Sequence, residues 1–399
     1  MKILIELYDR EPIYNYLAAS VFDFDRVYFV GDCAAINPKI KNKTEKYARI
    51  MGLSCEFVYR NAKSCDFGEI RAEISRIIDK ERKNGNACTI DVTGGRDLAL
   101  VACGTLLDKA EIIYYDRQIG SFRFLSSGKS HKVNLGIPCT ALITAAGGTV
   151  YETTRSMSFT ADEWGIIRRI IRIFFDRREN WTSLVKYLQR VSKKEGQKIG
   201  DSLFVDAPLS VADGGRRFSF NEAIMRELEE IGAIKSLEIT QNRIKFRYIS
   251  SDFATMLVNE GIWLEMSVYL TARDMPEFFE AQTGVKFVWH VPEKGENISR
   301  ILASSVPRNE VDAVLSKGIA PVFISCKTRV PTNEDLNELY AIKENFGGEL
   351  AYAIMATTKY VGKESPTYER AKAMGIGMID ERNFEKGTVA ERLLRLTGE

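Results

Sequence analysis

Over the first 120 residues, short apolar runs alternate with segments whose apolar residues recur every three or four positions. The first pattern is typical of buried strands and the second of helices packed on a sheet. Strands are expected at Ile3–Tyr8, Arg26–Val30, Cys55–Tyr59, Cys88–Val92 and Ile112–Tyr115, and helices at Ile13–Val21, Ile40–Met51, Gly68–Lys83 and Asp97–Leu107. The alternation predicts an α/β domain over residues 1–150, with a doubly wound, Rossmann-like parallel sheet that ends in a hairpin at Gly120–Gly128.

The pattern changes near Gly147–Thr154, where flexible residues precede a strongly helical stretch, Ala161–Lys194. A Gly/Asp-rich loop is expected at Ala212–Arg216, then a helix at Phe220–Ile231 and two strands at Ile234–Ile239 and Arg243–Tyr248. A helix followed by a β-hairpin is the skeleton of a winged helix. The pattern is equally compatible with packing material between two larger domains. We expect residues 155–250 to form a helical, winged-helix-like connecting region.

Residues 251–399 read as a third region of α/β type. Its expected helices are Glu260–Thr271, Asn333–Asn345 and Tyr368–Met374, and its expected strands are Val285–Trp289, Glu310–Leu315, Val322–Cys326, Leu350–Ala356 and Gly377–Ile379. The region is large enough to form a domain with its own core.

Composition narrows the class of protein. A chain of 399 residues is expected to form two or three domains, and 45% hydrophobic with 28% charged residues is typical of a soluble globular protein. No apolar stretch reaches the length that spans a bilayer, so we expect a cytoplasmic protein that binds no membrane. The seven cysteines form no CxxC pair, and only two histidines are present, which disfavours a zinc site or a histidine-based triad.

Charge is balanced overall but clustered locally. The net charge is +2, so the chain does not bind nucleic acid by bulk charge alone. The segment Arg168–Lys198 carries a clear surplus of Lys and Arg that could contact a phosphate backbone. The other reading is the solvated face of an amphipathic helix, since Ile167, Ile170, Ile171 and Phe174 recur at helical spacing.

Two predicted strands of the third region carry candidate catalytic residues. Residues two apart share a face of a strand, so Glu310 and Asp312 point the same way, as do Ser325 and Lys327. Glu265 lies on the preceding helix among mostly apolar neighbours, where a charge needs a partner or a metal. Carboxylates that hold divalent cations and a fixed lysine are what phosphodiester hydrolysis needs. The alternative is a charged edge strand that blocks edge pairing.

The pattern N-E-V-D-x-V, a turn and an apolar strand that ends S-C-K-T resembles the PD-(D/E)xK restriction-endonuclease-like superfamily. The tail Arg370–Asp380 is similar to the helix and strand that close this fold, and the resemblance covers residues 251–399. It implies a divalent metal, Mn²⁺ or Mg²⁺, held by Glu265, Asp312 and the backbone carbonyl of Cys326. Ser325 departs from the pattern, because the family has a carboxylate there, so Glu310 is a possible substitute.

A second candidate site lies in the first region, where ligands of open α/β sheets bind beyond the carboxyl ends of strands. The run Thr93-Gly94-Gly95-Arg96 leads directly from a strand into a helix, which brings backbone amides close to an anion. It is not the GxGxxG fingerprint, which disfavours a nicotinamide enzyme. A tight turn that only needs glycine is the alternative. Asp9, Asn15 and Asp32 are placed at the same edge by their positions at strand ends.

This strand, D-x-T-G-G and helix element, in a Rossmann-like domain before a nuclease-like region, resembles the CRISPR-associated Rossmann fold (CARF) domain. The resemblance implies an ancillary nuclease of type III CRISPR antiviral defence, activated by a cyclic oligoadenylate such as cyclic tetra-adenylate. It implies that Thr93, Gly94, Gly95 and Arg96 contact the ring, and that DNA or RNA is cut. One symmetric ring shared by two subunits implies a homodimer.

A function of another class is also compatible with the sequence. In a ligand-responsive transcription regulator, the sensor domain would direct the winged-helix-like element onto duplex DNA, and the nuclease region would be degenerate. Lys327 separates the two functions, because a regulator does not need acids and a lysine that converge.

Overall fold

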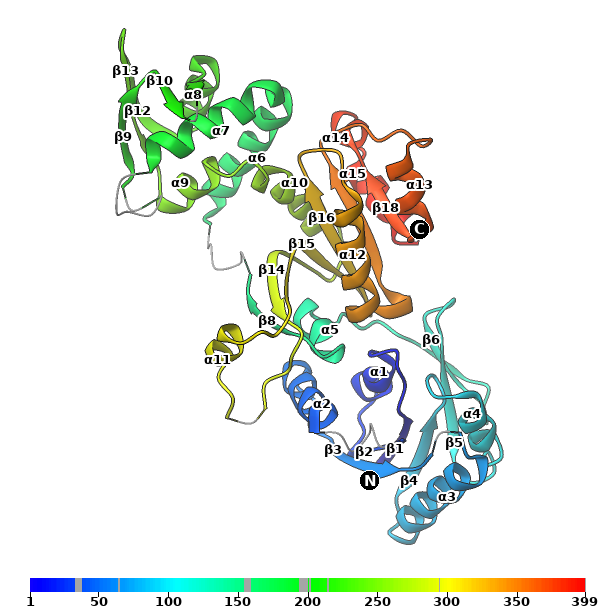
Figure 1. Cartoon of the computed structure of the whole chain (residues 1–399). Helices are drawn as coiled ribbons and strands as arrows, with labels where there is room; N and C mark the ends of the chain where they lie inside the picture. The colour runs from blue at the N-terminus through cyan, green and yellow to red at the C-terminus, as the bar shows by residue number, and fades with distance from the viewer. Residues whose placement is uncertain are drawn as a thin grey trace.

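The computed structural model describes residues 1–32, 38–63, 65–153, 159–193, 200, 202–213, 215–293 and 295–398. The molecule has three regions. The N-terminal sheet lies at one end, the middle region of the chain lies at the other end, and the C-terminal sheet lies between them (Figure 1). Within the described residues, no helix combines the length and the apolar character needed to cross a bilayer.

The N-terminal region is built on a seven-stranded sheet with the order β3-β2-β1-β4-β5-β6-β7. Its strands are β1 (Lys2–Leu7), β2 (Arg26–Gly31), β3 (Glu56–Asn61), β4 (Ala87–Asp91), β5 (Glu111–Asp116), β6 (Ser121–Phe124) and β7 (Ser130–Lys132). Strands β1 to β5 are parallel, and β6 and β7 add antiparallel. The predicted Rossmann-like plan is therefore confirmed. The predicted hairpin is shifted, because its turn connects β6 and β7.

Side-chain alternation along the strands divides the core of this sheet in two. Helices α3 (Phe67–Lys83) and α4 (Asp97–Gly104) pack against Ile3 and Ile5, while α1 (Tyr14–Val21) and α2 (Pro38–Met51) pack against Leu4. Neighbouring strand residues point to opposite faces, which lets one strand serve both cores. The four predicted helices are confirmed, although α4 ends three residues earlier than expected.

The middle region combines helices with a small antiparallel sheet. Its helices are α6 (Ala161–Asp176), α7 (Arg178–Ser192), α8 (Glu222–Glu230) and α9 (Ser251–Leu257). Strands β9 (Phe204–Pro208), β12 (Ile234–Ile239) and β13 (Arg243–Tyr248) pair in the order β12-β13-β9. The predicted helix and hairpin are confirmed, but the expected Gly/Asp-rich loop is the turn of a hairpin between β10 (Ser210–Asp213) and β11 (Arg216–Ser219).

The C-terminal region contains a six-stranded mixed sheet with the order β18-β17-β16-β15-β14-β8. Its strands are β8 (Thr149–Glu152), β14 (Glu280–Val288), β15 (Arg308–Lys317), β16 (Ala320–Lys327), β17 (Tyr352–Thr357) and β18 (Ile376–Ile379). Its helices are α10 (Ile262–Arg273), α11 (Ile298–Ala303), α12 (Asn333–Phe346), α13 (Pro366–Ala373), α14 (Glu381–Glu385) and α15 (Val389–Leu396), and a 3₁₀ turn, η3, spans Gly348–Leu350. Every strand predicted for this region is present.

Strand β8 (Thr149–Glu152) belongs to the C-terminal sheet, although it lies near residue 150 in the chain, and helix α5 (Cys139–Ala145) packs against both the C-terminal and the N-terminal core. Strand β8 pairs with β14, and Ile143 lies in one core with Phe287. Neither element was expected, because the sequence around them shows only short apolar runs whose partner is more than 130 residues away. The domain limits 1–150, 155–250 and 251–399 stay a prediction. The limit to test is the one near residue 150, because β8 pairs with the C-terminal sheet.

The N-terminal and C-terminal regions meet beside the end of α12. Ile13 lies in one apolar cluster with Ile319 and Leu350. The backbone N–H of Glu349 donates to the Glu11 carboxylate at 3.0 Å, and Arg117 donates to the Glu349 carbonyl at 3.0 Å. Figure 1 shows α12 extending along the C-terminal sheet toward the N-terminal region. The turn after α12 thus contacts the N-terminal region.

Candidate active site and ligand cleft

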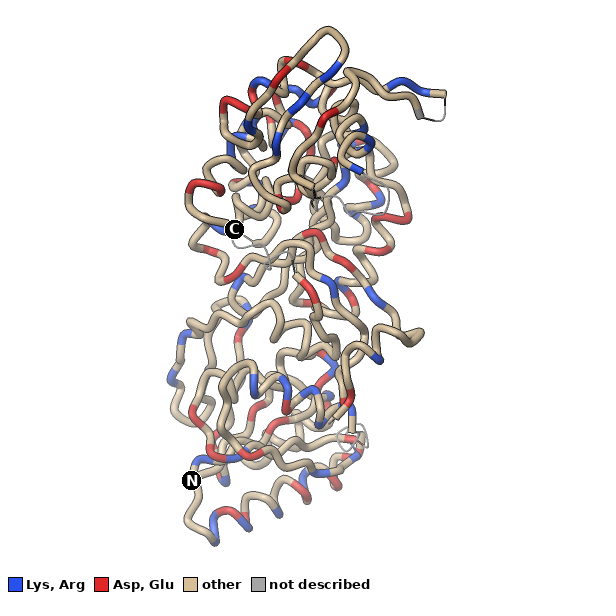
Figure 2. Tube along the Cα trace, turned by 90° about the vertical axis from the view of Figure 1, so that its left-hand side faces the viewer, with Lys and Arg blue, Asp and Glu red and all other residues tan. Residues whose placement is uncertain are grey.

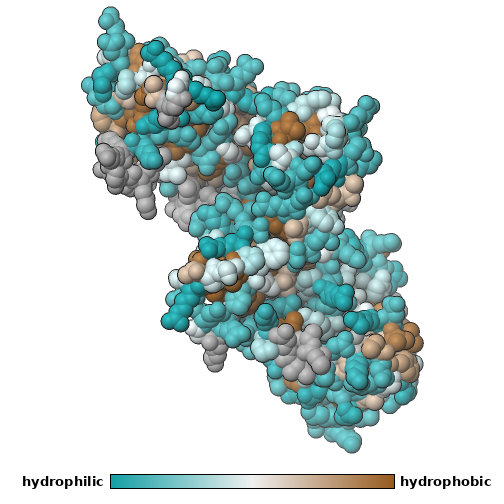
Figure 3. Space-filling view, in the orientation of Figure 1, coloured by the Kyte–Doolittle hydropathy of each residue, from teal (hydrophilic) through white to brown (hydrophobic). Residues whose placement is uncertain are grey.

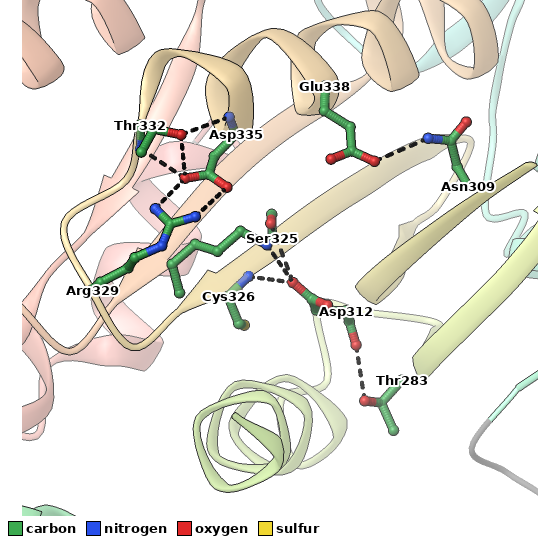
Figure 4. Close-up of polar contacts among 10 residues, drawn as sticks. Thr283, Asn309, Asp312, Ser325, Cys326, Arg329, Thr332, Asp335 and Glu338 are labelled. Atoms are coloured by element: carbon green, nitrogen blue, oxygen red, sulfur yellow. Dashed lines mark hydrogen bonds and ion pairs between the residues drawn. The ribbon is translucent and has the colours of Figure 1, made fainter. Parts of the chain in front are cut away.

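Asp312 is held at the centre of the candidate active site by strand β16. Its Oδ2 accepts a hydrogen bond from the Cys326 backbone N–H at 2.6 Å and one from the Ser325 hydroxyl at 3.2 Å (Figure 4). The Asp312 carbonyl accepts from the Thr283 hydroxyl on β14 at 2.9 Å. Three adjacent strands therefore fix this residue, because antiparallel pairing places the two predicted strands next to each other.

Lys327 is the last residue of β16, and its Nζ lies 3.9 Å from Asp312 Oδ2. The side chains of Lys327 and Asp312 keep 27% and 19% of their exposure. Both groups are therefore shielded from bulk water but open to a substrate. The predicted convergence of an acid and a lysine is present in the structure.

Glu265 approaches the same place from α10, in a buried setting. Burial, with the nearby charges of Asp312 and Glu310, raises the pKa of Glu265 to about 8, and Lys327 partly opposes this shift. Burial also raises the pKa of Asp312, although the Cys326 N–H and Lys327 act against it. Two carboxyl groups that share a low-dielectric site hold protons more tightly.

Glu310, Ser325 and Cys326 have different positions. Glu310 is exposed on β15, opposite Lys286 of β14, and acts on Glu265 through its charge. Ser325 stands where a carboxylate was expected, and its hydroxyl donates to Asp312. It therefore orients the Asp312 carboxylate and does not add a second one. The thiol pKa of Cys326 is raised well above its ordinary value, first by burial, so the side chain stays a thiol, which favours the predicted use of its backbone carbonyl.

Sequence reasoning missed Glu338, which lies on α12 above the site. Its Oε1 accepts from Asn309 at 3.2 Å, and its charge raises the pKa of Asp312 (Figure 4). The indole N–H of Trp289 holds the Asn309 side chain at 2.6 Å. Nothing in the spacing of α12 distinguishes Glu338 from the other acids of this helix, since only its contact with Asn309 of β15 selects it.

The donor types at the site are those of a hard divalent cation. Carboxylate and carbonyl oxygens are the ligands that Mg²⁺ and Mn²⁺ prefer, and Glu265, Asp312 and the Cys326 carbonyl supply them. Within the described residues, no three His, Cys, Asp or Glu side chains gather closely enough to hold a metal together. The set is therefore two carboxylates and a backbone oxygen, with Ser325 where a third carboxylate would stand.

We expect the stability of the protein to fall as pH rises toward 8, and the variant Glu265→Gln to remove this fall. The folded state keeps a proton on Glu265 up to a pKa of about 8, whereas the unfolded chain releases it near 4.5. Between these values the folded state binds more protons, so the free energy of unfolding decreases with rising pH. In EDTA, the melting temperature of Glu265→Gln should exceed that of the parent at pH 8.5 by about 2–4 °C, and not at pH 5. A difference that is constant from pH 5 to pH 8.5 would contradict this assignment.

The carboxyl ends of β1 and β4 form the candidate ligand cleft of the N-terminal region. Asp9 bridges the two loops there, since its Oδ2 accepts from the Gly95 N–H at 2.6 Å and its Oδ1 from the Glu11 N–H at 2.7 Å. Asn15 is buried and donates to the Asp9 carbonyl at 3.0 Å. Asn15 therefore shapes the loop, and the Gly95 amide, expected to face an anion, is occupied by Asp9.

The Thr93-Gly94-Gly95 run fits tightly against the end of β1. A Cβ on Gly94 would lie 2.6 Å from Asp9 Cβ, and one on Gly95, whose φ is +102°, would lie 2.8 Å from Leu7 Cδ1. The Thr93 hydroxyl accepts from the Tyr115 N–H at 2.9 Å. Gly94 and Gly95 are therefore needed for a tight turn, as the alternative interpretation expected. A tight turn at these glycines is compatible with a ligand bound above them.

Two cations at this edge could meet an anionic ligand. Arg96 is exposed at the N-cap of α4. Lys43 of α2 lies with its Nζ 5.9 Å from the Tyr8 ring centre, and burial lowers its pKa to about 8. Lys43 was missed because a single lysine in a lysine-rich helix carries no signal. Asp32 lies at the end of β2 as expected, next to residues 33–37, which are outside the described residues.

Part of the basic segment Arg168–Lys198 is neutralised within the molecule. Arg168 pairs with Asp274, Arg177 with Glu227 and Arg178 with Glu381. Lys194 and Lys198 lie outside the described residues. The pairs of Arg168 and Arg178 bind the middle region to the C-terminal region, and the pair of Arg177 lies within the middle region, which favours a structural role for these arginines.

No protein-family model matches the sequence, and no curated protein matches it significantly. Solved structures match the fold. The protein VC1899 from Vibrio cholerae has a TM-score of 0.76 at 16% identity, with 100% of this chain and 99% of that chain covered. Can2 from Sulfobacillus thermosulfidooxidans, solved in complex with cyclic tetra-adenylate, has a TM-score of 0.67 at 14% identity, with both chains fully covered.

A type III CRISPR defence DNA nuclease activated by cyclic oligoadenylate has a TM-score of 0.54 at 16% identity. The match covers 90% of this chain and 46% of that chain. At such identities the likeness is one of fold. The order of regions expected from the sequence, a Rossmann-like domain followed by a second α/β region, agrees with the two sheets of this fold.

Proposed function

We infer from this shared fold and from the Asp312–Lys327 pair that the chain is a metal-dependent endonuclease activated by a cyclic oligoadenylate, as in type III CRISPR defence. The observation that carries the inference is the 3.9 Å approach of Lys327 to an Asp312 that is oriented by two hydrogen bonds. A charged edge strand needs no such fixed pair. Cyclic tetra-adenylate is the expected activator, because one of the structures with the same fold was solved in complex with it.

The residues of the site suit hydrolysis of a phosphodiester. Lys327 would orient the attacking water and offset the negative charge that develops on the phosphoryl oxygens. Asp312 keeps the ammonium in place, and Ser325 and the Cys326 N–H keep Asp312 in its rotamer. A divalent cation held by Glu265, Asp312 and the Cys326 carbonyl would supply Lewis-acid activation of water and phosphate.

A few hydrogen bonds connect the candidate ligand cleft with the region of α12 near the candidate active site. Asp9 holds both the Gly95 amide and the Glu11 amide, and the Glu11 carboxylate in turn holds the Glu349 amide beyond the end of α12. The other part of α12 carries Glu338, which acts on Asp312. A ligand that displaces Asp9 would therefore change the support of α12. Differential affinity of the ligand for two such arrangements is what activation requires.

We expect the protein to be a homodimer that the variant Val101→Asp converts to monomers. Exposed apolar side chains gather on and beside α4: Leu98 at 47%, Val101 at 59%, Leu107 at 43% and Tyr114 at 38% exposure (Figure 3). Such a patch beside the ligand cleft suits a twofold contact in which one symmetric ring touches both subunits. Light scattering should give about half the mass for Val101→Asp, with Ile50→Asp, at 36% exposure on another helix, as the control. A monomeric parent protein would refute the dimer.

The test of the function is a cleavage assay with the purified chain. Plasmid, single-stranded DNA and RNA are incubated with cyclic tetra-adenylate or cyclic hexa-adenylate, in Mn²⁺ or in EDTA. We expect cutting of at least one substrate that requires both a ring and Mn²⁺. Absence of cutting under every condition would reject the nuclease, and metal-independent retention of duplex DNA would instead support a regulator that acts through the middle region.

A further inference from the structure

Two adjoining pockets lie along β18, the edge strand of the C-terminal sheet. Figure 1 shows this strand between α13 and α15. Their volumes are about 340 Å³ and about 290 Å³. Tyr368, Met378, Arg392 and Arg395 line both of them, so the two form one continuous depression. We call it the β18 groove. None of its residues belongs to the candidate active site.

The β18 groove is strongly basic. Its cations are Lys363, Lys372, Arg382, Lys386, Arg392 and Arg395. The single acid of its lining, Asp380, is 5% exposed and accepts hydrogen bonds from the Arg382 and Val361 N–H groups. Among the described residues, only Arg382 of the six cations forms an ion pair. Along most of the chain the two signs of charge are interspersed (Figure 2), whereas the β18 groove, like the segment Arg168–Lys198, has a surplus of cations.

The groove begins at the same edge of the sheet as Lys327. Strands β16, β17 and β18 are parallel, and Lys327 is paired with Thr357 while Ala356 is paired with Ile379. The carboxyl ends of the three strands therefore lie side by side, with a spacing of about 10 Å from the first to the third. The residues that follow these ends are also joined, since the Thr358 N–H donates to the Lys327 carbonyl at 3.3 Å.

An exposed aromatic ring stands between the catalytic edge and the groove. Tyr360 is 53% exposed, and the Arg382 guanidinium lies 4.2 Å from the centre of its ring. The Tyr360 N–H donates to the Glu381 carboxylate at 3.1 Å, which fixes the backbone of the loop. A fixed aromatic face beside cations is the arrangement on which unpaired bases stack.

We propose that the β18 groove binds the phosphate backbone of a single-stranded nucleic-acid segment that leaves the catalytic edge, with one base stacked on Tyr360. The choice of this ligand rests on the proposed nuclease function. A small anion would need one converging set of cations, whereas these cations are spread along two pockets, as a row of phosphates requires. An acidic peptide would not need the exposed ring at the entrance.

The test measures binding in EDTA, so that it does not depend on cleavage. The full chain is titrated with a fluorescein-labelled 20-nucleotide deoxythymidine strand and followed by fluorescence anisotropy at several salt concentrations. For the double variant Lys386→Ala/Arg395→Ala we expect binding roughly 10-fold weaker near 0.1 M salt. The slope of log K against log salt should decrease by about 1.4, since each lost contact to a single strand removes about 0.7.

Three further variants separate the groove from general effects. Lys80→Ala/Lys83→Ala on α3 removes the same charge from another exposed surface and should leave the slope unchanged. Lys386→Arg/Arg395→Lys keeps the charges and should retain binding. Tyr360→Ala should weaken binding to the single strand more than binding to a blunt duplex, which offers no unstacked base at this position.

The outcomes distinguish the two proposals. If the parent protein cuts nucleic acid but the alanine double variant binds the strand with unchanged affinity and slope, the groove proposal is overturned and the nuclease stands. If the parent never cuts but the double variant binds more weakly with a lower slope, the groove stands without the nuclease. Equal weakening by the α3 control would show a nonspecific charge effect and overturn the groove.

Discussion

Replacing Asp312 by asparagine is expected to lower the rate of nucleic-acid cleavage by roughly 10³-fold, and Lys327→Ala by a similar factor. Asp312 accepts the Cys326 N–H at 2.6 Å and lies 3.9 Å from Lys327, so the amide would lose the charge that both the cation and the ammonium need. Cleavage of a labelled substrate under single-turnover conditions, with activator and Mn²⁺ in excess, measures the change.

Loss of activity in these variants should not reflect unfolding. Burial raises the pKa of Asp312, so the folded state gains little from its negative charge, and the melting temperature of Asp312→Asn should stay within a few degrees of the parent. The matched control is Glu344→Gln on the exposed face of α12, which removes one carboxylate without touching the site and should keep full activity. Substantial cutting by both Asp312→Asn and Lys327→Ala would place the chemistry elsewhere.

The second large effect is expected for Gly95→Ala, which should destabilise the N-terminal region by about 2–4 kcal/mol and raise the activator concentration for half-maximal cleavage at least 10-fold. The new Cβ would meet Leu7 Cδ1 at 2.8 Å, and the φ of +102° is unfavourable for any residue with a Cβ. The displaced loop would also release the hydrogen bond from the Gly95 N–H to Asp9.

Two other glycines separate the causes of this effect. Gly94→Ala meets Asp9 Cβ at 2.6 Å without a positive φ, so it tests the close approach alone. Gly85→Ala has a φ of +73° with nothing within 4 Å, so it tests backbone strain alone and should leave the response to activator unchanged. Thermal unfolding and activator titration measure the two effects separately. An unchanged activator response in both Gly94→Ala and Gly95→Ala would exclude this loop from the ligand cleft.

Within the C-terminal site, the sequence located the residues but not their contacts. The shared face of Glu310 and Asp312, and that of Ser325 and Lys327, follow from alternation along a strand, which is a local property. The hydrogen bond from the Cys326 N–H to Asp312 depends on the register between β15 and β16, which no local sequence pattern encodes. Glu338 joins the site only because α12 packs across β16 and β17 and brings Glu338 to Asn309 of β15.

In the N-terminal region the sequence indicated the right edge of the sheet but not which groups are open to a ligand. Strand ends predicted the positions of Asp9, Asn15 and the glycine run. The structure shows that Asp9 occupies the Gly95 amide and that Asn15 is buried in the loop. The contact between Asp9 and Gly95 joins segments more than 80 residues apart, and its geometry depends on the completed β1–β4 pairing.

The kind and order of the main elements, together with Glu265, Asp312 and Lys327 as candidates, followed from the sequence alone, because hydrophobic periodicity and side-chain alternation act over a few residues. The folded structure was needed to show that β8 joins the C-terminal sheet, that burial raises the pKa of Glu265 to about 8, and that six cations line the edge of β18. The physical reason is that burial and electrostatic interactions depend on neighbouring residues from distant parts of the chain, and only folding brings these residues together.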